Sequence, residues 1–343
     1  MAKSLHELLE HRVQTKKDAL EIWAALPAVM GDCDRAETFG KTEAASAYSW
    51  LHLLDRYVRT WLALERLVEH NLLPMGKEGV RVLDVGTGPG PSAFATHDFY
   101  TAMIKYAEKS RKRLWHQPPQ MTCVEFRVPM NQFRHHLAEF MAMNDAPRSV
   151  LAMCDDVGVF NSIFPTEERK AMNHSLRWAE DSYYDGHRKQ WDWEPRYTPE
   201  EANHIANRHH RYRLFTFSNI LTKTSKIEEF RPNLIDILND AHAGSVLLLI
   251  GGRFGKYQDV RIEVADLAHE AGFLRTLENL QVSSSDAEMD GVVYAEQVRF
   301  YRKLERLGGD LPVDNPAARK CKGYFERGES GSWGTSSIHA YRK

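Results

Sequence analysis

Several features that mark familiar classes of protein are scarce in this sequence. Its 343 residues include only four cysteines, and no two of them have C-x-x-C spacing (Cys33, Cys123, Cys154, Cys321). This gives no sign of a zinc site or of a disulfide framework. No apolar run approaches the roughly 20 residues of a membrane-spanning helix, and the first residues are charged, unlike a signal peptide. We therefore expect a cytoplasmic protein without a membrane partner.

An excess of charge of one sign is also missing. Lys and Arg total 45, Asp and Glu total 47, and the net charge at pH 7 is −2. This balance disfavours a protein that binds nucleic acid mainly by attracting phosphate, although a local basic patch remains compatible with it. The segment HELLEH, from His6 to His11, lacks the second histidine of H-E-x-x-H because Glu10 stands there. We expect its charges to form a solvated helix face.

The most informative stretch that is present is RVLDVGTGPG, from Arg81 to Gly90. An apolar run that ends in alternating glycines is typical of a buried parallel strand entering a tight turn. The following segment has a helical pattern, so its first N–H groups would be available to a ligand. A dinucleotide fingerprint, G-x-G-x-x-G, is not met because Pro91 stands at its last position.

This stretch resembles the first motif of class I S-adenosylmethionine-dependent methyltransferases, which reads D/E-x-G-x-G-x-G. Four residues match it position for position: Asp84, Gly86, Gly88 and Gly90. The resemblance implies that these residues, with Thr87, bind S-adenosylmethionine as cofactor. A nucleotide site of another kind and a purely structural turn are the alternatives.

The resemblance also implies a role for polar residues at later strand ends. Glu125 lies at the end of a second predicted strand, 121–126, and would accept hydrogen bonds from both ribose hydroxyls of the cofactor. The distance in sequence from the glycine loop to this residue is longer than is usual in the family. Asp155 follows a third predicted strand, 148–154, and would lie near the adenine amino group, with Asp156 as the neighbouring choice. Ser218 ends a fourth, 213–219, and would face the transferring methyl group.

The regions around these strands give less specific signals. Residues 1–75 have helical patterns, and the aromatic residues of 44–71 are expected in the core. In the family a helix before the first strand often covers the cofactor, which makes Tyr48 and Arg56 candidates. In the helix that follows the second strand, we expect Arg134 and the two histidines after it to face solvent.

Residues 161–212 interrupt the alternation of strands and helices. They are rich in aromatic residues, and 162–212 contain eight Lys or Arg against nine Asp or Glu. We expect a helical subdomain that forms a lid over the acceptor pocket. Base stacking by RKQWDW, from Arg188 to Trp193, is the alternative, which the acids disfavour.

The predicted fold class is α/β, a doubly wound, mostly parallel sheet of the seven-stranded methyltransferase type. A very apolar fifth strand at 244–252 supports it, with further strands at 273–280 and 336–343 around a helix at 291–307. We predict three regions: residues 1–75 as an N-terminal helical region, 76–283 as the cofactor domain with the insertion 161–212, and 284–343 as a C-terminal helix and closing strand.

The predicted function is transfer of a methyl group from S-adenosylmethionine to an acceptor, which we expect to be a small molecule. The D/N-P-P-Y motif of amino-methyltransferases of adenine and glutamine is absent, as is a cysteine at the fourth strand end for cytosine-5 methylation. The alternative is a ribosome-associated, methyltransferase-like assembly protein that binds RNA, but the cysteine clusters of that group are missing. An NAD-linked oxidoreductase ranks third. No residue is marked as the catalytic base.

Overall fold

The structure is a computed structural model, and it describes residues 1–31, 39–76, 79–110, 118–125, 127–144, 183–185, 190–192, 212–218, 224–239, 241–252, 257–283, 290–309, 316–326 and 335–343. The predicted third strand, Asp155, Asp156 and most of the insertion lie outside the described residues.

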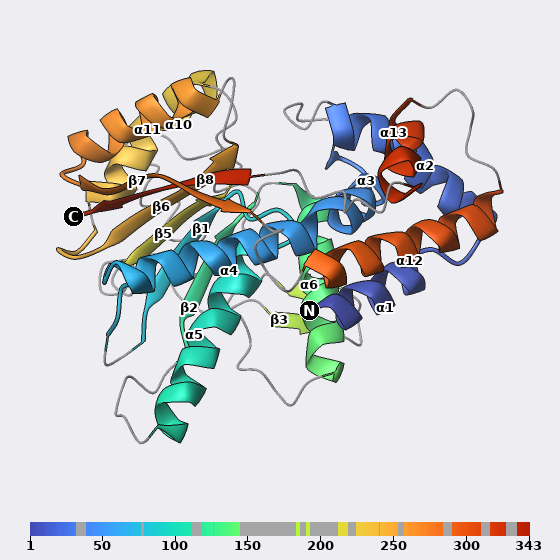
Figure 1. Cartoon of the computed structure of the whole chain (residues 1–343), viewed down its shortest axis with the longest axis horizontal. Helices are drawn as coiled ribbons and strands as arrows, with labels where there is room; N and C mark the ends of the chain where they lie inside the picture. The colour runs from blue at the N-terminus through green and yellow to red at the C-terminus, as the bar shows by residue number, and fades with distance from the viewer. Residues whose placement is uncertain are drawn as a thin grey trace.

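A six-stranded sheet forms the centre of the described part, in the order β2-β1-β5-β6-β8-β7 (Figure 1). The strands are β1 (Arg81–Val85), β2 (Gln120–Val124), β5 (Leu214–Ser218), β6 (Val246–Gly252), β7 (Leu274–Ser283) and β8 (Thr335–Arg342). The first four are parallel, and β8 is antiparallel to both β6 and β7. The prediction of a mostly parallel α/β sheet is therefore confirmed.

Helices cover both faces of this sheet. Leu83 and Val85 of β1 join a buried cluster with α10 (Thr224–Asn239) and α11 (Tyr257–Glu270). Val82, which points to the other face as strand alternation requires, joins the larger buried cluster. That cluster includes α4 (Leu54–Glu69), α5 (Pro91–Lys109) and α6 (Val128–Asn144). The sheet is thus a middle layer, which places its carboxyl edge at the end of the sandwich.

The N-terminal and C-terminal helices share one hydrophobic core. It is built by α1 (Ala2–Arg12), α2 (Lys16–Gly31), α3 (Thr42–Tyr48), the π-helical turn η2 (Ser49–Leu53), α4, α12 (Asp290–Gly308) and α13 (Pro316–Glu326). Trp23 packs edge-on against both Trp50 and Tyr301, with ring centroids 6.0 and 5.8 Å apart. The prediction that the aromatic residues of 44–71 lie in the core is confirmed for Tyr48 and Trp50, which are buried.

The insertion differs from the sequence-based expectation. In the insertion, the described residues form an antiparallel pair, β3 (Tyr183–Asp185) and β4 (Gln190–Asp192), where helix was predicted. Aromatic residues favour strands, so local propensity outweighs the helical interpretation there. The strands β7 and β8 pair directly although α12 and α13 separate them in sequence.

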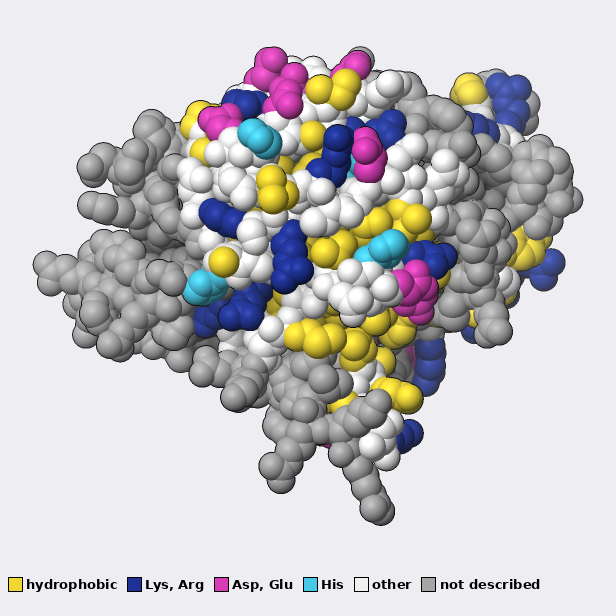
Figure 2. Space-filling view, turned by 60° about the vertical axis from the view of Figure 1, so that its left-hand side comes forward, with side chains coloured by type: hydrophobic (Ala, Val, Ile, Leu, Met, Phe, Trp, Pro, Cys, Tyr) yellow, Lys and Arg dark blue, Asp and Glu magenta, His cyan; other side chains and the backbone are white. Residues whose placement is uncertain are grey.

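No helix among the described residues has both the length and the apolar character needed to cross a membrane. On the face drawn in Figure 2, basic, acidic and apolar side chains occur together. This mixture agrees with the small net charge of the whole chain.

Candidate functional site

The glycine loop connects β1 to α5 at the carboxyl edge of the sheet. Three of its residues have positive φ: Gly86 at 66°, Gly88 at 58° and Gly90 at 92°. Non-glycine residues rarely adopt this left-handed region, which explains the alternating pattern. The N–H groups of Gly86 and Thr87 both donate to the Val124 carbonyl, at 2.8 and 3.1 Å, and so join the loop to the end of β2.

The peptide groups on either side of Gly88 are held by two buried side chains of opposite charge. The Gly88 N–H donates to Glu125 Oε2 at 2.9 Å, and Arg134 Nη1 donates to the Gly88 carbonyl at 3.1 Å. The other carboxylate oxygen, Glu125 Oε1, accepts from the Arg127 N–H at 2.9 Å. The loop is therefore preformed by contacts with the segment that follows β2.

Arg134 corrects a sequence-based expectation. We expected this side chain on the solvent face of its helix, but it is fully buried. A buried guanidinium needs hydrogen-bond acceptors and a compensating charge. The Gly88 carbonyl and the nearby Asp84 carboxyl supply them. Helix periodicity alone could not reveal partners that lie 46 and 50 residues earlier in the chain.

Gly88 and Gly90 differ in the space that surrounds them. A Cβ atom built on Gly90 would lie 2.7 Å from Phe94 Cε2 and 2.9 Å from Arg134 Cγ, so this glycine is required by internal packing. A Cβ atom on Gly88 would meet no atom of the described residues within 4 Å. The open space over Gly88 is where a ligand would approach the main chain, so the loop fits the cofactor that the sequence motif implies.

Asp84 lies beneath the loop and is almost completely buried. Thr216 Oγ1 on β5 donates to its Oδ1 at 2.6 Å. Burial raises the pKa of the Asp84 carboxyl to about 6, although hydrogen bonding by Thr216, Ser92 and Thr87 and the charge of Arg134 oppose that rise. Part of this carboxyl population is therefore protonated near neutral pH, and its ionisation responds to any charge bound nearby.

Three other residues were predicted for this site from the sequence: Ser218, Glu125 and Asp155. Ser218 ends β5 opposite Ile250 of β6 and is partly exposed. Because β1, β2, β5 and β6 are parallel, Ser218 lies at the same sheet edge as the glycine loop and Glu125. Glu125 follows β2 directly, since that strand ends at Val124 and not at the predicted residue 126. Asp155 lies outside the described residues.

Tyr48 and Arg56 lie together in the helical layer before β1. The Arg56 guanidinium lies 4.8 Å from the centroid of the Tyr48 ring. This ring packs edge-on against Phe39 at 5.2 Å, and the Arg127 guanidinium lies 5.2 Å from the Phe39 centroid. A chain of cation–π and aromatic contacts thus leads from α3 to the segment after Glu125. Phe39 and Arg127 were not identified from sequence, since no motif marks them.

A buried polar group lies where η2 joins α4. Arg59 and Asp55 form an ion pair of 2.8 Å, and Arg59 Nη1 also donates to Ser336 Oγ on β8 at 2.7 Å. Burial, with a smaller effect of the Arg59 charge, lowers the pKa of His52 to about 3, so its ring is neutral at pH 7. Ser336 lies opposite Gly252 at the carboxyl end of β6. The hydrogen bond from Arg59 to Ser336 therefore joins α4 to this edge of the sheet, and the ion pair with Asp55 holds the Arg59 guanidinium in place.

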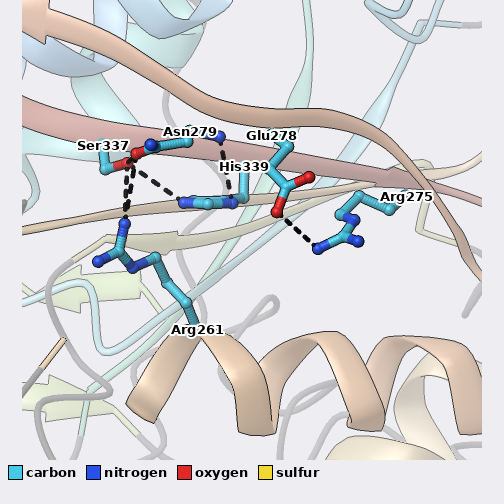
Figure 3. Close-up of polar contacts among 6 residues, drawn as sticks. All are labelled: Arg261, Arg275, Glu278, Asn279, Ser337 and His339. Carbon is cyan, nitrogen blue, oxygen red and sulfur yellow. Dashed lines mark hydrogen bonds and ion pairs between the residues drawn. The ribbon is translucent and has the colours of Figure 1, made fainter. Parts of the chain in front are cut away.

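A second polar cluster joins β7, β8 and α11 (Figure 3). Ser337 Oγ lies 3.2 Å from His339 Nε2, and the Asn279 N–H donates to His339 Nδ1 at 3.4 Å. The Nδ1 atom therefore acts as acceptor, so Nε2 carries the proton and donates to Ser337. Such a ring accepts no proton from the serine, and this pair is structural. It fixes the irregular pairing near Asn279, whose φ is 52°.

The chain has weak similarity to several solved structures. No protein-family model matches the sequence, and no curated protein matches it. Among solved structures, the cyclase SpnF is 15% identical with a TM-score of 0.41, over 84% of this chain and 81% of its own. Magnesium protoporphyrin IX methyltransferase from Synechocystis PCC 6803, with bound S-adenosylmethionine, is 10% identical with a TM-score of 0.38, over 93% and 90%.

A third match is a methyltransferase from Geobacter sulfurreducens in complex with S-adenosylhomocysteine. It is 9% identical with a TM-score of 0.35, over 82% of this chain and 90% of its own. Such low values support no inference about reaction or substrate, and the matches include a cyclase as well as methyltransferases. These similarities assign the chain to no family.

Proposed function

We propose that this protein is an S-adenosylmethionine-dependent methyltransferase that acts on a small molecule. The observation that carries the proposal is that the main chain at Gly88 is held rigidly beside open space. Its peptide groups are fixed by Glu125 and Arg134, while no atom in the described part of the chain lies within 4 Å of where its Cβ would stand. A rigid main chain beside open space, at the carboxyl edge of a parallel sheet, is suited to binding a ligand closely.

Different residues would bind different parts of the cofactor. Each carboxylate oxygen of Glu125 accepts one backbone N–H and keeps a further lone-pair site, so the pair of oxygens would accept the two ribose hydroxyls. The Gly86–Gly90 loop would pass beneath the methionine part, with Thr87 fixing the turn by donating to the Asp84 carbonyl at 2.8 Å. Asp155 would contact the adenine, and Tyr48 and Arg56 would cover the site.

When bound, the cofactor supplies a methyl group that its sulfonium has already activated. The protein then needs mainly to align donor and acceptor and to exclude water. Ser218, at the end of β5, would orient the acceptor. The aromatic residues of 161–212 would form the lid over it. We also propose a cytoplasmic location and the three regions 1–75, 76–283 and 284–343.

The test is turnover with a pool of possible acceptors. Purified protein and S-adenosylmethionine labelled in the methyl group are incubated with the small-molecule fraction of a cell extract and, in parallel, with its RNA and its protein. We expect S-adenosylhomocysteine to form faster than in buffer, with label in a small molecule. No formation above buffer, or label found only in RNA or protein, would count against the proposal.

A further inference from the structure

Four basic side chains lie along one face of α12. Counted from the first, the others stand three, four and seven residues further along, so the four occupy about 10 Å of the helix: Arg299, Arg302, Lys303 and Arg306. The opposite face of the same helix is buried in the core through Val293, Gln297, Phe300 and Leu304. This arrangement concentrates positive charge on the outer face of a firmly packed helix.

The basic face lines a groove of about 500 Å³ between α12 and α1. The two helices lie side by side in Figure 1. Tyr294 and Val298 supply aromatic and apolar surface to the groove, and Glu10 is its only acidic lining residue among those that the structure describes. Lys303 Nζ donates to the Glu10 carbonyl at 2.9 Å, which fixes one cation in place. The groove is thus concave, partly apolar and strongly basic.

The two acids near the groove both contact His6, and Glu296 also lies near a groove arginine, with its Oε1 3.8 Å from Arg299 Nη1. Glu10 Oε1 lies 3.2 Å from His6 Nε2, and Glu296 Oε2 lies 3.3 Å from His6 Nδ1. His6 itself is buried, which corrects the expectation that all charges of HELLEH face solvent. Within the described part of the chain, Arg302 and Arg306 have no acidic partner. Since like charges four residues apart repel each other on a helix, this face would gain stability from a bound anion.

We propose that the groove between α1 and α12 binds a small organic phosphate, with its phosphate groups on Arg302 and Arg306 and its organic part against Tyr294 and Val298. Guanidinium groups bind phosphate oxygens through paired, charge-assisted hydrogen bonds. Arg302 and Arg306, which have no acidic partner among the described residues, favour an anion of multiple charge, such as a diphosphate. The groove has the volume of a small-molecule site, and the chain's net charge of −2 offers no general attraction for a nucleic acid.

Pyrophosphate is the first probe, measured by calorimetry at constant ionic strength. We expect one pyrophosphate per chain, bound at least ten times more weakly by the double variant Arg302→Ala/Arg306→Ala. The matched control, Arg66→Ala/Arg275→Ala, removes two exposed arginines outside the groove and should bind as wild type. Phenyl phosphate should bind more tightly than inorganic phosphate, because its ring contacts the apolar surface.

Three results would overturn this inference. The first is no pyrophosphate binding by the folded wild type, and the second is equal weakening by the control pair. The third is binding of a labelled single-stranded RNA that the groove variant loses and pyrophosphate does not displace, which would assign the groove to RNA. Glu125→Ala should leave pyrophosphate affinity unchanged, so that failure here and failure of the proposed cofactor site remain distinguishable.

Discussion

Removing the Glu125 carboxylate should affect both the loop and the ligand. The carboxylate accepts the N–H groups of Gly88 and Arg127, each at 2.9 Å. A hydrogen bond to a charged group contributes on the order of 1.5–3 kcal/mol. For Glu125→Ala, two such bonds set an upper bound of about 3–6 kcal/mol on the fall in unfolding free energy. Losing the hydroxyl acceptors should further weaken cofactor binding by roughly ten- to a hundred-fold.

Glu125→Gln separates these contributions. Its side chain keeps one acceptor oxygen, so one of the two backbone N–H groups stays satisfied and the losses should be smaller than for alanine. Unfolding by urea gives the stability, and calorimetry with S-adenosylhomocysteine gives the affinity. The control is Glu65→Ala, which removes an exposed carboxylate that accepts from Trp61 Nε1. If both Glu125 variants fold and bind as wild type does, the assignment of the ribose to this carboxylate is wrong.

Three further predictions concern stability. Gly90→Ala should lower the unfolding free energy by more than roughly 2 kcal/mol, because the added Cβ overpacks the site and the φ is strained. Gly88→Asn should lower it by less than about 1 kcal/mol, because asparagine tolerates the left-handed region. Equal losses for the two variants in urea unfolding would contradict the difference in packing. The pKa of Asp84 is raised from 3.8 in the unfolded chain to about 6 in the folded protein, so the folded state binds this proton more tightly. The resulting contribution to the unfolding free energy is complete below pH 3.8 and is lost as the pH rises through about 6. The unfolding free energy of Asp84→Asn, relative to that of wild type, should therefore rise between pH 4 and 7 by on the order of 2–3 kcal/mol. A difference that does not change with pH would refute this. His52 and His339 have pKa values lowered by burial to about 3 and about 4, so the folded state should lose stability as pH falls from 6.5 toward 3; replacing both with glutamine should flatten this loss in thermal unfolding, and an unchanged slope would count against their burial.

The parts of the fold that sequence predicts are those with local signals. The strand at β1 and the glycines after it follow from residues within a ten-residue window, and the structure gives the physical reason in three positive φ angles. The very apolar β6 is likewise recognisable because both of its faces are buried. Its antiparallel partner, β8, has clear alternation, and only its position in the sheet required the structure.

Contacts between distant segments explain what sequence did not predict. Arg134 looked like one of several polar residues on a helix, and its partners Gly88 and Asp84 become visible only when β1 and α6 are placed together. The same holds for His6, whose partner Glu296 is nearly 300 residues away. Periodicity identifies which face of a helix is apolar, but it does not reveal a polar residue that finds its counter-charge inside.

Titration with S-adenosylhomocysteine, comparing wild type with Gly88→Asn, measures whether the glycine loop binds the cofactor. Asparagine tolerates the φ of 58° at this position, and its side chain would enter the space above the loop that the described residues leave open. We expect one ligand per wild-type chain and at least a tenfold weaker affinity for the variant, with little change in unfolding free energy. A wild type that binds no S-adenosylhomocysteine, or a folded variant that binds it equally well, would contradict a cofactor site at this loop.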